Sequence, residues 1–145
     1  MTEEFKFSAE LDVRISDINY GGHLGNDRYL SLFHEARLRY LKQFGYSELD
    51  IGDQTSLIMS QAHIDLTAQA FWGDRLIVFV RIAQITPIKF RMEYRMVSRD
   101  DPTKQIASGY TILVGFDYQN QKLKRLPTNF IQHIQQFEQL EMRRD

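Results

Sequence analysis

Apolar and polar residues alternate at the start of the chain, over residues 5–15. Every odd position in this stretch, from Phe5 to Ile15, is apolar, and every even position, from Lys6 to Arg14, is polar. Because successive side chains of a strand point to opposite faces, a period of two places all the apolar residues on one side. The stretch therefore predicts a β-strand with one buried face.

A polar loop with three glycines spans residues 16–27. After this loop, apolar residues recur at the spacing of an α-helix. Apolar side chains recur three or four positions apart as far as about residue 44. The residues that mark this face are Tyr29, Phe33, Ala36, Tyr40 and Phe44. Asn26 or Asp27 suits the N-cap and Gly45 suits the C-terminal end, because these residue types satisfy the free groups of helix ends. We expect one helix with so broad an apolar surface that the rest of the protein must cover it.

Strand signals dominate the remainder of the chain after a loop at residues 47–55. Four β-rich segments, separated by turn-forming residues, span residues 62–70, 75–85, 89–96 and 105–118. Consecutive long strands joined by short turns pair antiparallel, so we expect neighbours in sequence to be neighbours in the sheet. Thr128 can cap a short C-terminal helix with Phe130, Ile134 and Phe137 on its apolar face.

This order of elements predicts an α+β fold. One helix with a wide apolar surface needs a sheet to cover it, and a strongly twisted antiparallel sheet curled around that central helix meets the need. Such an arrangement is the hot-dog architecture, and we expect residues 1–145 to form a single domain of this kind. The sheet keeps open edges, so we expect self-association as a homodimer or homotetramer to cover one of them.

The amino-acid composition limits which classes of partner the protein can bind and indicates the cellular compartment in which it works. The 18 Lys and Arg residues nearly balance the 19 Asp and Glu residues, giving a formal net charge of −1. This balance argues against a nucleic-acid partner and against a polybasic membrane anchor. Apolar runs are too short to span a membrane, and the N-terminus lacks the apolar region of a signal peptide. The chain has no cysteine, which excludes thiolate chemistry and fits a reducing compartment, so we expect a cytoplasmic protein.

Chemistry-bearing residues gather in the loop that joins the first strand to the helix. A carboxylate (Asp17), an amide (Asn19), an imidazole (His23) and a helix start (Asn26) lie within ten residues. Free N–H groups at a helix start, aimed at a carbonyl oxygen, stabilise the oxyanion that forms in acyl transfer. The alternative interpretation is a polar loop in which the Asp and Asn side chains make Asx turns and the His is a surface hydrogen-bonding residue.

The same segment carries a family resemblance. Its residues in common with that family are Arg14, Ser16, Asp17, His23, Asn26, Tyr29, Leu30, Glu35, Ala36 and Arg37. In this spacing they resemble the opening motif of the 4-hydroxybenzoyl-CoA thioesterase-like branch of hot-dog enzymes. The resemblance implies a homodimer or tetramer that hydrolyses acyl-CoA or acyl-carrier-protein thioesters to a free acid and a thiol. It implies neither a metal nor another cofactor.

One departure from the family pattern concerns the reacting group. In the resembled family a second Asp attacks the thioester or activates water, and Asn19 occupies that position here. An amide is neither a base nor a useful nucleophile, although it can orient a water or hold a carbonyl. We expect Asp17 or Glu35 to supply the base, while Asn19 and His23 position the carbonyl or the water. Asp17 is the first of these two choices, because it lies on the loop that feeds the helix start.

Substrate contacts are expected from the backbone around Gly22, Gly25 and Asn26, with the amides near Gly25 and Asn26 polarising the thioester carbonyl. Two other functions stay open. Loss of the carboxylate at Asn19 could leave a non-catalytic acyl-CoA binding module. Alternatively, His23 and Glu35 resemble the His and helix-carboxylate pair of hot-dog hydratases and dehydratases.

Overall fold

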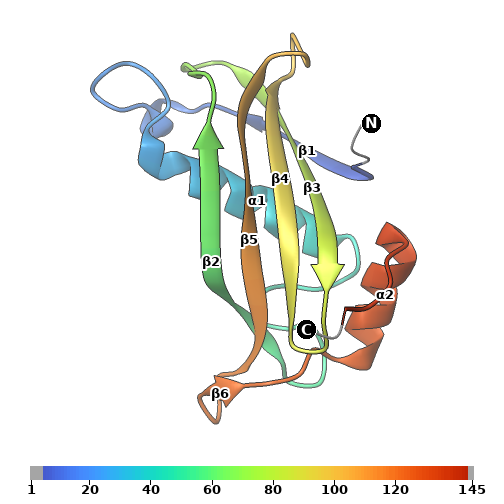
Figure 1. Ribbon diagram of the computed structural model, residues 1–145. Coiled ribbons are helices and arrows are strands. Elements are labelled where there is room, and N and C mark those ends of the chain that lie inside the picture. Colours follow the sequence, from blue (N-terminus) through green and yellow to red (C-terminus); the bar gives the residue numbers. More distant parts are fainter. Residues whose placement is uncertain (1–4, 144–145) are drawn as a thin grey trace.

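The computed structural model describes residues 5–143, which form a curled antiparallel sheet and two α-helices (Figure 1). In chain order the elements are β1 (Phe7–Asp12), α1 (Tyr29–Lys42), β2 (Ser56–Leu66), β3 (Arg75–Ile85), β4 (Lys89–Ser98), β5 (Gln105–Asp117), β6 (Lys122–Leu123) and α2 (Thr128–Glu138). None of the helices within this part of the chain is long and apolar enough to cross a bilayer.

The sheet wraps around α1. Its strand order is β1-β3-β4-β5-β2, with β6 paired to β5, and every pairing is antiparallel. Figure 1 shows α1 running across the strands behind the sheet, with α2 beside β3. The expected α+β fold, a curled antiparallel sheet around one central helix, is therefore confirmed.

The position of β2 differs from the sequence-based expectation in two ways. The strand spans Ser56–Leu66 rather than residues 62–70, and it pairs with β5 rather than with β3. A register shift between Met59 and Gln61 interrupts the period of two in the first half of the strand, which hid it from the pattern. At the other end, the amides of Thr67 and Ala68 both donate to the Ile106 carbonyl, so the chain leaves the ladder there and crosses to β3.

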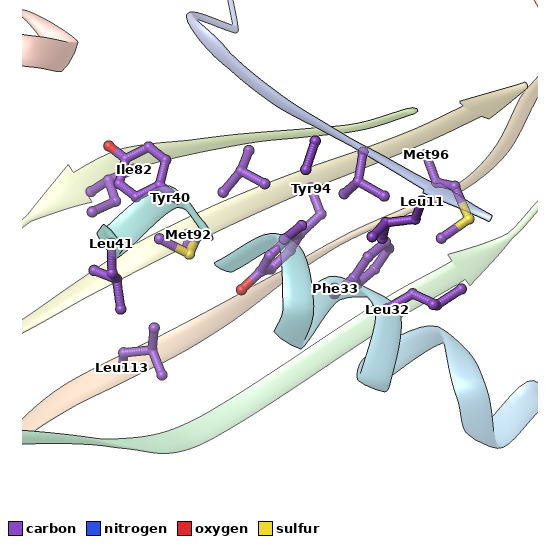
Figure 2. Packing of buried hydrophobic residues seen from close by; sticks show 14 of the residues in the cluster. Leu11, Leu32, Phe33, Tyr40, Leu41, Ile82, Met92, Tyr94, Met96 and Leu113 are labelled. Atoms are coloured by element: carbon purple, nitrogen blue, oxygen red, sulfur yellow. The ribbon is translucent and has the colours of Figure 1, made fainter. Parts of the chain in front are cut away.

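The core lies between α1 and the concave face of the sheet (Figure 2). Phe33 of α1 stacks on Tyr94 of β4 with ring centroids 4.7 Å apart and planes 4° apart. Beside this stack, the buried Arg37 donates from Nε to Glu48 at 2.5 Å and from Nη1 to the Tyr94 hydroxyl at 3.0 Å. The Tyr94 hydroxyl also bonds with the Thr111 hydroxyl at 2.7 Å, so the polar groups of this interface satisfy one another.

The edge strand β2 is poorly covered. Its register with β5 places Ala62, opposite the buried Thr111, on the concave side, yet Ala62 is exposed. Two residues further along, Ile64 is half-buried, and Leu66 is 47% exposed. No described strand pairs with the free side of β2, which forms one margin of the sheet in Figure 1. An apolar concave stripe and an open hydrogen-bonding edge thus occur on the same strand.

Replacing the central aromatic residue of α1 should measure how far the fold depends on this packing. Phe33 is fully buried, so Phe33→Ala should lower the free energy of unfolding by about 3–5 kcal/mol through lost burial and a cavity. Leu38 lies on the outer side of the same helix and is 38% exposed, so Leu38→Ala should cost less than about 1 kcal/mol. Urea unfolding of both variants checks this, and equal losses would contradict it.

Candidate functional site

The loop between β1 and α1 is pinned at several points by backbone hydrogen bonds. It contains two short 3₁₀ turns, Ile15–Asp17 and Asn26–Arg28, and the second runs directly into α1. An isolated β-bridge joins Ile18 to Leu24, and the Leu24 amide donates to the Ala70 carbonyl at 2.7 Å. The loop is therefore fixed both to itself and to the segment that leads from β2 to β3.

The side chain of Asp17 is buried and bonds to the loop itself, and Asp17 does not line the cavity described below. Its residue is only 3% exposed, and its carboxylate accepts the Arg14 backbone amide at 2.9 Å and the Arg14 guanidinium at 3.4 Å. Burial by itself would raise the pKa of this carboxyl, but the hydrogen bonds and charge of Arg14 lower the pKa below its usual value. The ionised carboxylate is thus committed to Arg14.

Asn19 closes the turn at the tip of the loop. Its side-chain Oδ1 accepts the Gly21 amide at 2.9 Å and the His23 amide at 3.4 Å, and its own amide donates to the His23 carbonyl at 2.9 Å. Between them, Gly22 has a φ of +82°, a conformation that favours glycine. The Asx turn anticipated as the alternative interpretation is present, and it clamps the backbone of His23 from both sides.

His23 and the helix start open onto one small cavity of about 220 Å³. The loop side of this cavity is lined by His23, Leu24, Asn26 and Tyr29, and the opposite side is lined by residues 66–69 at the end of β2. His23 is half-buried, and its Nδ1 lies 3.1 Å from the Leu24 carbonyl oxygen. The cavity thus lies where the loop, the start of α1 and the exposed end of β2 meet.

The backbone amides near the helix start differ in availability. The Gly25 amide, one of the expected carbonyl-binding groups, already donates to the Asp17 carbonyl at 3.0 Å. Within residues 5–143, no hydrogen bond engages the amides of Asn26 and Asp27. A Cβ at Gly25 would lie 2.7 Å from Oδ1 of Asp27, but that oxygen ends an exposed side chain that can move away. The amides that can receive an oxyanion are therefore those of the first two residues of the turn.

Glu35 is separate from this cavity. Its carboxylate is about half exposed and pairs with Arg39 one turn further along α1, and Arg39 also donates to the Glu10 carbonyl at 3.0 Å. Glu35 is not among the residues lining the cavity. The structure thus brings together His23 and Asn26, places Asp17 and Asn19 behind them as loop supports, and leaves Glu35 outside.

Sequence reasoning missed several lining residues. Tyr29 was counted as part of the apolar helix face, and it is indeed 3% exposed, but it also lines the cavity. Burial raises the pKa of its hydroxyl. Thr67 and Gln69 were assigned to a strand, although they follow its end and line the cavity wall. Only a correct end for β2 would have revealed them.

The described residues hold no cluster of three or more His, Cys, Asp or Glu side chains suited to a metal ion. His63 and Asp65, which share one side of β2, bond to each other at 3.1 Å and are both exposed.

Several proteins of known structure are similar to this chain over nearly its whole length. A 1,4-dihydroxy-2-naphthoyl-CoA thioesterase from Synechocystis superposes with a TM-score of 0.81 at 26% identity, covering 91% of this chain and 97% of that one. A protein from Staphylococcus aureus, solved in complex with CoA, shares the fold with a TM-score of 0.83 at 14% identity, covering 100% of this chain and 90% of that one. A DHNA-CoA thioesterase from the same organism gives a TM-score of 0.79 at 17% identity, covering 91% and 88%.

A search of curated proteins found no significant match. The family model of the thioesterase-like superfamily, in contrast, matches residues 13–135, which include the whole loop, α1 and the four long strands β2 to β5 that follow it. The chain therefore belongs to the thioesterase-like superfamily, and thioester hydrolysis is the activity that this membership assigns to it.

Proposed function

We propose that this protein hydrolyses acyl-CoA thioesters, or the equivalent thioesters of an acyl carrier protein, to a free acid and a thiol. The observation that carries the proposal is the cavity at the start of α1, which is lined by His23 and Asn26 and lies where the backbone amides of Asn26 and the following Asp27 are free. The similar protein from Synechocystis is a CoA thioesterase, and one similar protein from Staphylococcus aureus was solved with CoA. Both likenesses support a CoA thioester as the substrate.

The chemistry needs a polarised carbonyl and an activated water. In our proposal the thioester oxygen is received by the Asn26 and Asp27 amides at the positive end of the helical segment, where developing negative charge is stabilised. Gly22, with its positive φ, lets the loop turn tightly enough to present these groups, and Gly25 leads into the 3₁₀ turn that carries them. Asp17 and Asn19 act as positioning residues that hold the loop, because their side chains are committed to it.

We further propose that the protein acts as a homodimer joined along β2. The free edge of that strand and its uncovered concave residues Ala62, Ile64 and Leu66 favour addition of a second copy. Leu66 also lines the cavity, so a partner on this edge would close the open side of the site and exclude water. We place this dimer in the cytoplasm, since a cysteine-free chain suits a reducing compartment.

A non-catalytic acyl-CoA binding module is the second candidate, and one observation favours it. Asn19 replaces the carboxylate of the resembled family, and its Oδ1 is taken up by two backbone amides. The hydratase alternative has less support, because Glu35 pairs with Arg39 and does not line the cavity with His23.

The test of the proposed function is a panel of acyl-CoA substrates with detection of the free thiol. Aliphatic and aromatic acyl groups should be compared, and at least one should be turned over steadily by the folded, oligomeric protein. Calorimetric binding of acyl-CoA without any product would favour the binding module instead. Hydration of an enoyl-CoA without thiol release would favour the hydratase.

Asp17→Asn should lower both kcat and stability. We expect kcat to fall at least about tenfold as the loop loosens, and the free energy of unfolding at pH 7 to fall by about 1.5 kcal/mol or more. Because folding lowers the pKa of Asp17, its contribution is complete above the unfolded value of about 3.9 and is lost as pH falls through the folded value. The difference in stability between wild type and variant should therefore shrink below about pH 4.

A matched control is Asp101→Asn, which removes a carboxylate that also accepts a backbone amide, that of Thr103, but lies in the turn between β4 and β5. It should leave kcat unchanged. Full activity of Asp17→Asn would contradict a positioning role for the loop carboxylate.

Ala62→Glu should break the dimer. A charge on the uncovered concave side of β2 would be buried without a partner in a β2-to-β2 interface, which costs several kcal/mol. Light scattering after size exclusion should change from twice the chain mass of 17.2 kDa to that mass itself. Asn129→Glu adds the same charge on an exposed position of α2 and should leave the dimer intact. A dimer that survives Ala62→Glu would assign the interface to another surface.

A further inference from the structure

We propose that His23 is the general base of the reaction, taking a proton through Nε2 from the water that attacks the thioester. This inference rests on the proposed hydrolysis and deepens it by naming the group that replaces the missing carboxylate. It differs from the expectation that Asp17 or Glu35 supplies the base.

The carboxylates of the chain are poorly placed for that task. The residues lining the cavity are His23, Leu24, Asn26, Tyr29 and residues 66–69, none of which carries a carboxylate. Asp17 is buried against Arg14, and Glu35 pairs with Arg39 outside the cavity. A general base must come within hydrogen-bond reach of the proton that it removes, so geometry excludes both within one protomer.

The hydrogen bond of His23 also selects the tautomer of the neutral imidazole that a general base requires. A carbonyl oxygen only accepts hydrogen bonds, so the contact of 3.1 Å between Nδ1 and the Leu24 oxygen places the ring proton on Nδ1. The lone pair then resides on Nε2, as a base needs. Leu24 itself is 1% exposed and is fixed by the bond of its amide to Ala70, so the orienting carbonyl is rigid.

The surroundings of Nε2 leave it accessible. Within residues 5–143 no hydrogen bond engages this atom, and a Cβ on Gly21 would lie only 3.3 Å from it, so glycine at this position keeps that side open. Tyr29 is the other titratable residue lining the cavity, and residues 66–69 add none. Outside the lining, the loop also carries Arg14, Asp17, Tyr20, Asp27 and Arg28. Imidazole is therefore the one basic nitrogen of this protomer that the cavity presents.

The step balances without any further reactant. As the water oxygen forms a bond to the thioester carbon, its proton passes to Nε2 and the carbonyl electrons move to the oxygen held by the Asn26 and Asp27 amides. The tetrahedral species then collapses and the carbon–sulfur bond breaks. The imidazolium returns the proton to the departing sulfur, giving the acid and the thiol. During the step the second ring proton stays on Nδ1 and remains hydrogen-bonded to the Leu24 carbonyl oxygen, which stabilises the imidazolium.

The experiment compares wild type with His23→Gln and His23→Ala in steady-state hydrolysis of the best acyl-CoA between pH 4.5 and 8.5. We expect kcat/KM of the wild type to rise with pH across this range, because only a neutral imidazole can accept the proton of the water. Both variants should lose about 10²–10⁴-fold in kcat and should lose this rise. Added imidazole should restore part of the activity of His23→Ala, which a merely structural histidine would not allow.

Controls separate the base from folding and binding. His133→Gln removes an exposed histidine of α2 that bonds with Tyr46, and it should retain full kcat and the wild-type pH profile. Calorimetry with a non-hydrolysable thioether analogue of acyl-CoA should give the same affinity for wild type and His23→Gln. Circular dichroism and size exclusion should show that both His23 variants keep the fold and the oligomer.

The outcomes are distinguishable. If wild type hydrolyses acyl-CoA and His23→Gln keeps more than a tenth of kcat, or if imidazole restores nothing, His23 is not the base although the proposed function stands. If the wild type hydrolyses no acyl-CoA at all, the proposed function fails and the assignment of His23 fails with it.

Discussion

The structure depends on burying one broad face of α1 against the sheet. The helix carries too much apolar surface to face water, and the sheet curls around it because only a curled sheet can reach that surface from several directions. The stack of Phe33 on Tyr94 marks the centre of the contact, and Arg37 anchors the same face through Tyr94 and Glu48. Since α1 is fixed in this way, the segment that enters it is fixed as well, and with it the cavity at the helix start.

The loop before α1 has its own internal scaffold. Arg14 and Asp17 tie its first turn, Asn19 ties its tip, and the bond from Leu24 to Ala70 fastens its end to the chain beyond β2. Polar side chains that sequence reasoning grouped as possible reacting groups therefore divide into two layers. The inner ones support the backbone, whereas His23 and Asn26 line the cavity in which we propose that the substrate lies.

Much of the fold could be predicted from the sequence, because α1 and α2 have regular apolar periods and β3 is a continuous β-rich run, and all three predictions matched the observed elements closely. The strand β2 could not, because its bulge breaks the period and its alternation continues past its end into residues 67–70. Its pairing with β5 was also hidden, since partners far apart in sequence leave no local signal. For the site, residue types and spacing indicated the right loop, but the direction of each side chain depends on hydrogen bonds such as those of Asp17 to Arg14, which no spacing encodes.

The pairing of β2 with β5 also determines the order in which the molecule can be assembled. On a ribosome β2 is made before β3, β4 and β5, so it has no partner in the sheet until nearly the whole chain has emerged. The hairpin of β3 with β4 can form locally and early, whereas β2 can add only after β5 has extended that sheet. The margin of the sheet that bounds the cavity is therefore the last part to be completed, and the nascent chain must carry an unpaired apolar strand until then.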